Sequence, residues 1–428
     1  MTPQDQGSKN QELEPISQAI IEARTILTSV DPNSPQSELT PIADIVGDAT
    51  VVGLGEHSHG TNEVFQYRYR LFRYLVTEHD FRVFALETEF SGAVVLDEYV
   101  TGGDGTAHDV IAHDGVHAIY QCEPMVELIE WIRSFNEGRD ADDQVRVHGI
   151  DLNFSTPTRI VSFLERVDLN ALDEIADPLE RIAENAISID LEANLDEIAT
   201  GYSEIADQLL DRFEQNRSEY IQASSEREFE LAKRDLEVVA KSGEHWSMVS
   251  EQESAVALRS EVMAENVRWA FEYESSNRVV VWAHNNHVNR GPFADGSFGD
   301  GPSMGEHLAR AEELEYVNIA SSVGEESFLS FSMEEGSFEA FDRPDAPAGS
   351  LADVLSEVDD GPFFVDLETL RDDERAEQWL QEDAERLVMG ARVDDEDEMM
   401  GVLNTNPAEE FDGLFFIPEG TPVPTLDD

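Results

Sequence analysis

One short stretch of the chain places a carboxylate beside two imidazoles. It reads Gly-Glu-His-Ser-His-Gly and contains Glu56, His57 and His59. An apolar segment at 50–54 precedes it, and an amphipathic segment at 61–79 follows it. This order predicts a strand, a tight turn and a helix. Because ligands of open α/β sheets bind at the carboxyl ends of the strands, the turn is suited to acid–base chemistry.

We expect His59 to be the general base of this turn. A neutral imidazole has a pKa of about 6.5 and can take a proton from water near neutral pH. Glu56 can orient the ring and stabilise its charged form. The alternative is that His59 only caps the turn or the following helix. His57 points away from Glu56 in an extended turn, so we expect a structural or peripheral role for it.

Arg68 lies on the apolar face of the helix predicted at 61–79. Side chains of a helix lean toward its N-terminus, so Arg68 can point back at the turn. There it would bind a carboxylate or stabilise an oxyanion. The alternative is an ion pair with Glu63 or Glu87 that has no part in the chemistry.

Three further apolar segments end on polar residues. Alternation of strands and helices predicts a parallel sheet, in which all these strand ends meet at one edge. His284 and His287 would act there as a second acid, as oxyanion donors or as metal ligands, with the other polar groups orienting them or binding substrate. The segments and their endings are 81–86 with Glu87, 144–150 with Asp151, and 278–283 with His284, Asn285 and His287.

The same groups suggest a metal site as an alternative. His59, His284, His287 and Glu87 are suitable ligands for Zn²⁺ or a similar ion. However, the segment from His284 to His287 lacks the Glu of a helical His-Glu-x-x-His motif, and the chain has a single cysteine, Cys122. We therefore expect no required cofactor. A Gly-x-Ser-x-Gly nucleophile elbow and a complete dinucleotide-binding loop are absent as well.

The elements that hold these groups predict an α/β fold with a mostly parallel central sheet flanked by helices. Its two parts are expected at 15–155 and 276–420. The segment 156–275 has few Gly and Pro residues and long periodic apolar–acidic runs, which predict a large all-helical insertion. This insertion is either a structural subdomain or a lid or wall that shapes substrate access. Residues 1–14 and the acidic residues 421–428 are expected to be disordered or frayed tails.

The acidic composition indicates adaptation to a salty solvent more than binding to a particular partner. The 428 residues carry a formal net charge of −64, and the acidic residues are spread along the chain. Dispersed carboxylates keep a protein soluble in molar salt, so we expect a halophilic, acidic, cytoplasmic protein. The sequence contains no basic patch that would predict binding to nucleic acid, and it contains no run of 18 apolar residues that would predict a membrane span. The oligomeric state is left open.

Several motifs resemble the erythromycin esterase family, beginning with its Gly-Glu-x-x-His-Gly pattern at Glu56 and His59. The resemblance implies an α/β fold with a helical insertion and, in the best-known members, hydrolysis of a macrolide lactone, which confers antibiotic resistance. It also implies that His59 activates water without a covalent serine intermediate and that Glu56, Arg68 and His284 belong to the site. The other matching segments are Phe84-Ala-Leu-Glu87, Trp131-Ile-Arg-Ser-Phe-Asn136, His148-Gly-Ile-Asp-Leu152, Val281-Trp-Ala-His-Asn-Asn-His287, Ser303-Met-Gly-Glu-His-Leu308 and Phe411-Asp-Gly-Leu-Phe-Phe416.

These observations together predict a hydrolase that cleaves a lactone or another carboxylic ester of a small molecule. His59 would activate water, oriented by Glu56, while Arg68 and either His284 or His287 stabilise the oxyanion or position the substrate. One alternative is a metal-dependent hydrolase that uses the same cluster. The other is a non-catalytic binding or exopolysaccharide-biosynthesis accessory protein, because some relatives carry that label.

Overall fold

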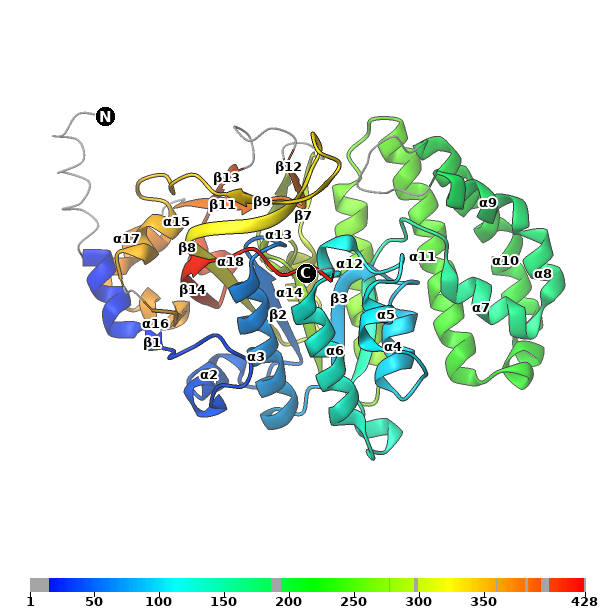
Figure 1. Ribbon diagram of the computed structural model, residues 1–428, viewed down its shortest axis with the longest axis horizontal. Coiled ribbons are helices and arrows are strands. Elements are labelled where there is room, and N and C mark those ends of the chain that lie inside the picture. The colour runs from blue at the N-terminus through cyan, green and yellow to red at the C-terminus, as the bar shows by residue number, and fades with distance from the viewer. Residues whose placement is uncertain are drawn as a thin grey trace.

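A ten-stranded sheet runs through the centre of the molecule, with helices on both of its faces (Figure 1). None of the helices described is long and apolar enough to cross a membrane. The tail expected at 1–14 lies outside the described residues. The computed structural model describes residues 15–185, 194–276, 278–295, 299–358, 361–381, 384–393 and 400–426.

Most strands of this sheet are parallel, which confirms the predicted α/β class. They are β1 (Thr25–Ile26), β2 (Val51–Glu56), β3 (Val83–Glu89), β4 (Arg146–Asp151), β5 (Val279–His284), β8 (Tyr316–Ser332), β10 (Phe363–Asp366) and β14 (Gly413–Gly420), with the short β9 (Ser337–Asp342) and β12 (Arg392–Val393) beside β8. The parallel part has the order β14-β8-β2-β5-β3-β4, and β10 and β1 extend its β14 edge in antiparallel orientation.

Parallel pairing brings the predicted strand ends to one edge of the sheet. Glu56 on β2 lies opposite His284 on β5, and β3 pairs with β5 on the other side. The register between β3 and β4 shifts before Glu89, which faces Asp151. The polar residues that follow four separate apolar segments therefore lie together, as the alternation of strands and helices predicted.

The central strands are buried on both faces and feed two apolar cores. Val52 and Leu54 belong to one core, while Val51 belongs to the other, because successive side chains of a strand point to opposite faces. The helices of the first face include α3 (Asn62–Glu78), α4 (Val94–Val100), α5 (Ala107–Ile111) and α6 (Glu123–Asn136), and those of the second include α12 (Val256–Tyr273), α14 (Met304–Ala309) and α16 (Leu367–Arg371).

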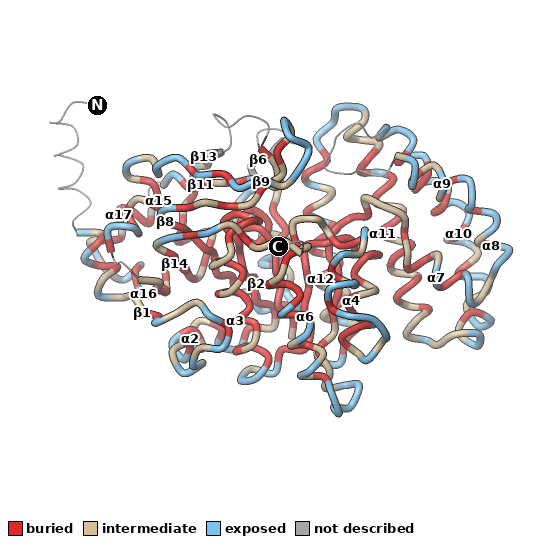
Figure 2. Tube along the Cα trace, in the orientation of Figure 1, coloured by how far each residue is buried: buried red, intermediate tan, exposed pale blue. Residues whose placement is uncertain are grey.

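A helical region with its own apolar core lies at one end of the molecule (Figures 1 and 2). Its long periodic runs form helices as predicted, and α10 and α11 pack along each other. Helix α12, which we expected inside the insertion at 156–275, instead packs against β3, β4 and β5 and belongs to the α/β core. The region contains α7 (Thr158–Val167), α8 (Leu169–Glu174), α9 (Ala176–Glu184), α10 (Leu195–Ala223) and α11 (Glu226–Ser250).

The second half of the chain contains strands that the sequence did not predict. The apolar pattern of the sequence predicts a strand only at 315–321, but β8 continues to Ser332, where buried and partly exposed positions alternate. Gly324 and the charged residues after it interrupt the apolar run on which the prediction depended. Two further antiparallel strand pairs are formed by β6 (Pro292–Asp295) with β7 (Gly299–Pro302) and by β11 (Ala384–Met389) with β13 (Met400–Thr405).

The C-terminal segment is anchored on the α/β core, so the expectation of a frayed tail is wrong for residues 421–426. The Asn62 backbone N–H donates to the Thr421 carbonyl at 2.8 Å, and the Glu123 N–H donates to the Pro424 carbonyl at 3.1 Å. Val423 is buried in the core formed by α3 and α6. Apolar side chains among the acidic ones thus fix this segment beside the start of α3.

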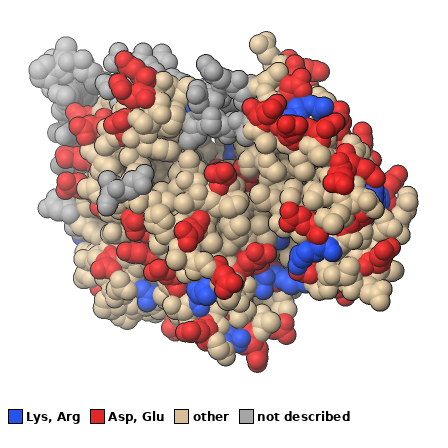
Figure 3. All heavy atoms as spheres, turned by 45° about the vertical axis from the view of Figure 1, so that its right-hand side comes forward, with Lys and Arg blue, Asp and Glu red and all other residues tan. Residues whose placement is uncertain are grey.

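Acidic side chains are scattered over the face of the molecule shown in Figure 3, and basic ones are fewer. This agrees with the dispersed charge in the sequence, and the expected adaptation to molar salt stays a prediction.

Gly60 follows the Glu56–His59 turn at a very close approach of two chain segments. Its carbonyl accepts hydrogen bonds from the Leu329 N–H at 3.0 Å and the Val423 N–H at 2.9 Å. A Cβ atom at Gly60 would lie 1.7 Å from the Leu329 carbonyl oxygen. Only glycine therefore fits between the turn and β8.

We expect Gly60→Ala to lower the free energy of unfolding by about 1–3 kcal/mol, because β8 has to move away from the turn. Urea unfolding followed by circular dichroism measures this change. Gly401→Ala is the matched control, since its nearest new contact would be an ordinary 3.5 Å to the Val388 carbonyl. Equal stability of the Gly60 variant and wild type would contradict the close approach.

Candidate active site

Glu56 is the hub of the cluster at the strand ends. It is the last residue of β2, and its side chain is completely buried. One carboxylate oxygen, Oε1, lies 2.7 Å from His59 Nδ1 and accepts a hydrogen bond from the Tyr120 hydroxyl at 2.9 Å. The other oxygen, Oε2, accepts a hydrogen bond from Arg68 Nη1. Both oxygens are thus held by donors from different elements.

Arg68 reaches back from α3 to the turn, as the lean of helical side chains predicted. It is fully buried, and its Nη2 donates to the carbonyls of Leu54 at 2.8 Å and Ala283 at 3.3 Å. Its guanidinium lies 3.9 Å from the ring centroid of Trp282. Arg68 pairs with Glu56 rather than with Glu63 or Glu87, so its position fits the fixing of Glu56 better than contact with a substrate.

His59 faces Glu56 with one ring nitrogen and is 11% exposed at its side chain. Because Nδ1 faces Glu56, Nε2 lies on the opposite edge of the ring. Burial disfavours the protonated ring, but the charge of Glu56 and its hydrogen bond outweigh burial, so the pKa of His59 is raised. The turn therefore holds an imidazole that is more basic than an isolated histidine.

His284 lies beside His59, with ring centroids 5.0 Å apart, but its own nitrogens are occupied. Nδ1 accepts a hydrogen bond from the Asn286 N–H at 3.1 Å, so Nε2 carries the proton and donates to the His57 carbonyl at 3.2 Å. Burial, and then the positive charge of a protonated His59, lower the pKa of His284 well below its usual value. His284 is consequently a neutral wall of the site, which does not fit the expected roles of second acid or oxyanion donor.

Glu87 orients His287, as expected. His287 Nε2 lies 3.0 Å from Glu87 Oε1, while Glu87 Oε2 accepts a hydrogen bond from the His284 backbone N–H at 2.7 Å. Burial opposes the charged carboxylate, but the neighbouring His287 outweighs it and holds the pKa of Glu87 well below its usual range. His287 Nδ1 is buried without a hydrogen-bond partner.

Asp151 does not orient an imidazole, contrary to our expectation. It forms two hydrogen bonds, 2.9 and 2.5 Å long, with Arg259 on α12. The same guanidinium lies 3.5 Å from Glu87. Burial opposes ionisation, but Arg259 outweighs it and lowers the pKa of Asp151. The Arg259 guanidinium thus links Asp151 to Glu87.

His57 and Asn285 connect the turn to β8. His57 Nε2 lies 3.1 Å from Glu326 Oε2, which agrees with the structural role expected of His57. Asn285 donates to the Ser321 carbonyl at 2.8 Å and accepts from the Ser321 N–H at 3.2 Å. Both polar ends of Asn285 are used in this brace, so the expectation that it orients or binds substrate does not fit its contacts.

Three groups that complete the cluster have no recognisable signal in the sequence. Tyr120 ends a short 3-10 helix, η2 (Ala118–Tyr120), far along the chain from Glu56. Arg259 belongs to a helix that we placed in the insertion. Glu326 lies in the unpredicted half of β8, where it binds His57 and Thr61. Each is positioned by tertiary packing, and none has a characteristic spacing to the residues that it contacts.

A possible metal-donor group overlaps only partly with the predicted ligands. Donor atoms of Glu56, His59 and Glu87 lie within 4.8 Å of one another, whereas His284 and His287 do not belong to this group. Glu56 already accepts hydrogen bonds from Tyr120 and Arg68, so a divalent ion bound to it would lie close to a fixed guanidinium charge. The donor set fits proton transfer better than metal binding, and we derive no step through a metal.

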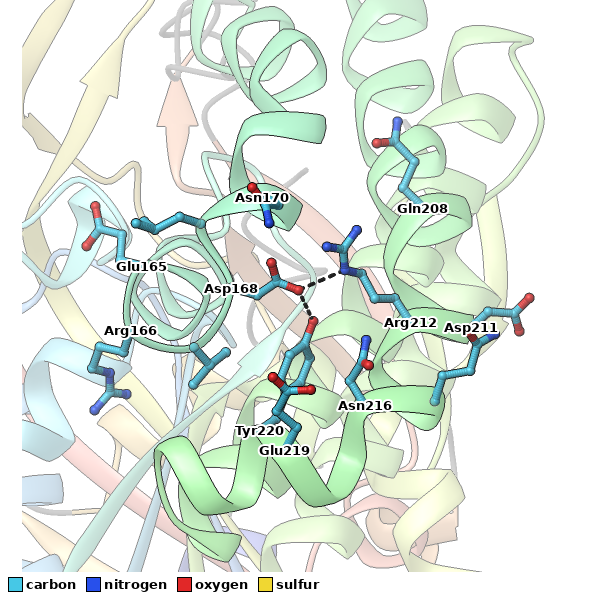
Figure 4. Close-up of a pocket in the computed structure, with 13 residues that line it drawn as sticks. Glu165, Arg166, Asp168, Asn170, Gln208, Asp211, Arg212, Asn216, Glu219 and Tyr220 are labelled. Atoms are coloured by element: carbon cyan, nitrogen blue, oxygen red, sulfur yellow. Dashed lines mark hydrogen bonds and ion pairs between the residues drawn. The ribbon is translucent and has the colours of Figure 1, made fainter.

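A separate hollow of about 780 Å³ lies in the helical region, away from the strand ends (Figure 4). Asp168 is bound there by Arg212 at 2.9 Å and by the Tyr220 hydroxyl at 2.7 Å. None of the residues predicted for the site lines this hollow. These three groups hold the start of α8 against α10.

Arg68→Met leaves the buried carboxylate of Glu56 without its cation, so we expect the free energy of unfolding to fall by about 3–5 kcal/mol. Urea unfolding measures this loss. Arg310→Met is the control, because Arg310 is 68% exposed and its ion pair with Glu306 lies at the surface. Similar stabilities for the two variants would show that Arg68 does not stabilise Glu56.

The family follows from comparisons with known proteins. The Erythromycin esterase family model matches residues 76–420, a range that includes β3, β4 and β5 but begins after the Glu56–His59 turn. Erythromycin esterase type II of Escherichia coli is 24% identical over 309 residues, which cover 67% of this chain and 72% of that protein.

Two solved structures share the fold. A succinoglycan biosynthesis protein has a TM-score of 0.78 at 22% identity, covering 95% of this chain and 97% of its own. An erythromycin esterase mutant in its open conformation has a TM-score of 0.67 at 19% identity, covering 93% of this chain and 97% of its own. The extent of the family match makes the conclusion plain: this chain belongs to the erythromycin esterase family.

Proposed function

We propose that this protein hydrolyses a carboxylic ester or lactone with water activated by His59. The observation that carries the proposal is the 2.7 Å contact between Glu56 and His59 Nδ1 inside a buried network. Membership of the erythromycin esterase family, and the E. coli relative named as an esterase, support the reaction class.

The contact with Glu56 selects the useful tautomer of His59. A carboxylate accepts a proton donor, so Nδ1 carries the hydrogen and Nε2 keeps its lone pair. Nε2 then accepts a proton from a water molecule as the water oxygen attacks the ester carbonyl. The developing imidazolium is stabilised by the charge of Glu56, which Arg68 and Tyr120 hold in place.

The rest of the reaction uses the same proton. Attack of water gives a tetrahedral intermediate, and its collapse breaks the bond to the alkoxide leaving group. The Nε2–H of His59 returns the proton to that oxygen, which yields a carboxylic acid and an alcohol and restores neutral His59. No covalent bond to the protein forms, so Ser58 has no part in these steps.

His287, rather than His284, is the second imidazole that we expect to contact substrate. Both nitrogens of His284 are engaged by the backbone, whereas Nδ1 of His287 has no hydrogen-bond partner. The Glu87 contact at the other nitrogen fixes the ring. This arrangement supports a positioning contact from His287 to the polar part of the substrate.

His59→Asn should lower kcat/KM by at least about 10³-fold, because the variant lacks both the general base and the contact between His59 and Glu56. A panel of esters and lactones that includes erythromycin, assayed in molar salt with and without a chelator, provides the substrate. Molar salt screens the repulsion among the acidic residues. His79→Asn, at the opposite end of α3, is the matched control.

Three outcomes would contradict this proposal. A His59→Asn variant that keeps its activity would remove His59 from the mechanism. Activity that disappears with the chelator and returns with a divalent ion would favour the metal-dependent alternative. Wild-type protein that turns over none of the panel would favour a binding or biosynthetic accessory role.

The pH dependence follows from the raised pKa of His59. His59 must be neutral to accept a proton, so kcat/KM rises with pH through a midpoint above the usual value of about 6.5. Glu56→Gln removes the charge that stabilises the imidazolium, and the midpoint should move to lower pH while the maximal rate falls. Initial rates measured between about pH 5 and pH 10 test the direction of this shift, since kcat/KM should change about tenfold per pH unit below the midpoint. An unchanged midpoint would show that Glu56 does not raise the pKa of His59.

A further inference from the structure

Residues 421–426 form a strap that passes along two segments of the candidate active site. The strap follows β14 and runs antiparallel first to the start of α3 and then to the segment just before α6 (Figure 1). Pro422 is paired with Thr61, and Thr425 is paired with Cys122. These two contacts lie far apart in the sequence, but each lies next to a group of the proposed catalytic network.

One oxygen of Glu56 receives two donors that come from different parts of the chain. His59 Nδ1 lies 2.7 Å from Oε1, and the Tyr120 hydroxyl donates to the same oxygen at 2.9 Å. Hydrogen bonds weaken steeply when their distance or angle departs from the ideal. The turn that carries His59 and the helix η2 that carries Tyr120 must therefore be held in a fixed relation, so that both side chains reach one atom.

The strap is bonded to the residues that directly follow His59. The Val423 N–H donates to the Gly60 carbonyl at 2.9 Å, and the Asn62 N–H donates to the Thr421 carbonyl at 2.8 Å. These two hydrogen bonds flank the pair formed by Pro422 with the residue between Gly60 and Asn62. The strap thus holds the exit of the turn and the start of α3 through their backbones.

The strap is also bonded to the residues that shortly follow Tyr120. The Glu123 N–H donates to the Pro424 carbonyl at 3.1 Å. Between its two contacts the strap is anchored by Val423, which is 3% exposed and belongs to the same apolar core as Tyr120. One buried side chain and the hydrogen bonds on either side of it therefore connect the His59 turn to the segment after η2.

We propose that the strap is a positioning element of the active site, which holds His59 and Tyr120 on the same oxygen of Glu56. It acts through the backbone at Gly60 and Glu123 and is not itself a catalytic segment. A displacement of about 1 Å at an active site can slow a reaction by roughly 10²-fold, so loosening the strap should lower kcat more than it changes KM. This inference rests on the proposed ester hydrolysis, because it assigns the strap a role in that reaction.

A reversible test loosens the strap and then fastens it again within one polypeptide. Val423→Gly removes the buried anchor and frees the backbone, while Thr425→Cys places a second thiol opposite Cys122. Antiparallel partners have Cα atoms about 4.5–5.5 Å apart, a separation that a disulfide spans. The double variant is therefore loose when it is reduced and fastened when it is oxidised.

We expect the reduced double variant to have a kcat at least about tenfold below that of wild type, with KM within about twofold. Oxidation should restore kcat to within about threefold of wild type, at a temperature where circular dichroism shows both forms to be folded. Val423→Gly alone contains only Cys122, so oxidation should leave its kcat unchanged. Val402→Gly, at an exposed valine of β13, is the matched control and should keep the kcat of wild type.

The His59 Nδ1–H proton provides a readout that needs no turnover. A proton donated to a carboxylate takes part in a short, strong hydrogen bond and resonates far downfield in ¹H NMR. We expect this signal in wild type and in the oxidised double variant, and we expect it to weaken or move upfield on reduction. If the reduced double variant unfolds, Val423→Ala in place of Val423→Gly loosens the strap less and gives the same comparison.

The outcomes separate this inference from the proposed function. Equal kcat and equal His59 signals in the folded oxidised and reduced forms would overturn the role of the strap even if ester hydrolysis is real. A loss confined to KM would overturn it as well, because it would indicate an effect on substrate binding. A His59 signal that changes reversibly with oxidation, in a protein that turns over no ester, would support the strap as a positioning element while contradicting the hydrolase.

Discussion

The buried carboxylate of Glu56 is the constraint on which the site depends. A charge without solvent is tolerated only when donors surround it, and here they come from three elements. Arg68 arrives from α3, Tyr120 from η2, and His59 from the turn itself. Satisfying Glu56 therefore fixes the entry of α3, the loop before α6 and the tautomer of the proposed base in a single network.

Other buried carboxylates show how the partner decides the charge. Glu87 and Asp151 lie beside His287 and Arg259, and their pKa values are lowered. Glu89 lies two residues after Glu87 on β3, where burial outweighs its hydrogen bond with the Ser155 hydroxyl and raises its pKa to about 8. Along this sheet edge, Glu87 beside His287 and Asp151 beside Arg259 are thus ionised, whereas Glu89 is neutral and joins Ser155.

The sequence was sufficient for the parts that obey local rules. Strand ends follow from apolar runs, and the meeting of Glu56 with His284 follows from parallel pairing. The approach of Arg68 follows from the direction of helical side chains. Tyr120 and Arg259 were missed because tertiary packing alone brings them to the site. The same holds for the brace between Asn285 and Ser321, which turned an expected substrate contact into a structural one.

His284 and His287 are distinguished by their hydrogen-bond partners and not by their spacing in the sequence. His284 is the last residue of β5 and His287 follows three residues later. The family resemblance alone does not say which of the two is the second imidazole of the site. Backbone groups occupy both nitrogens of His284, while His287 keeps Nδ1 free beside Glu87.

The most direct test of the account is the protonation state of His59, measured by NMR of protein labelled with ¹⁵N-histidine. The His59 signal is assigned by its loss in His59→Asn. We predict that neutral His59 carries its proton on Nδ1, leaves Nε2 unprotonated, and titrates above the usual value of about 6.5. A neutral ring with its proton on Nε2, or a pKa below the usual value, would contradict the activation of water by the Glu56–His59 pair.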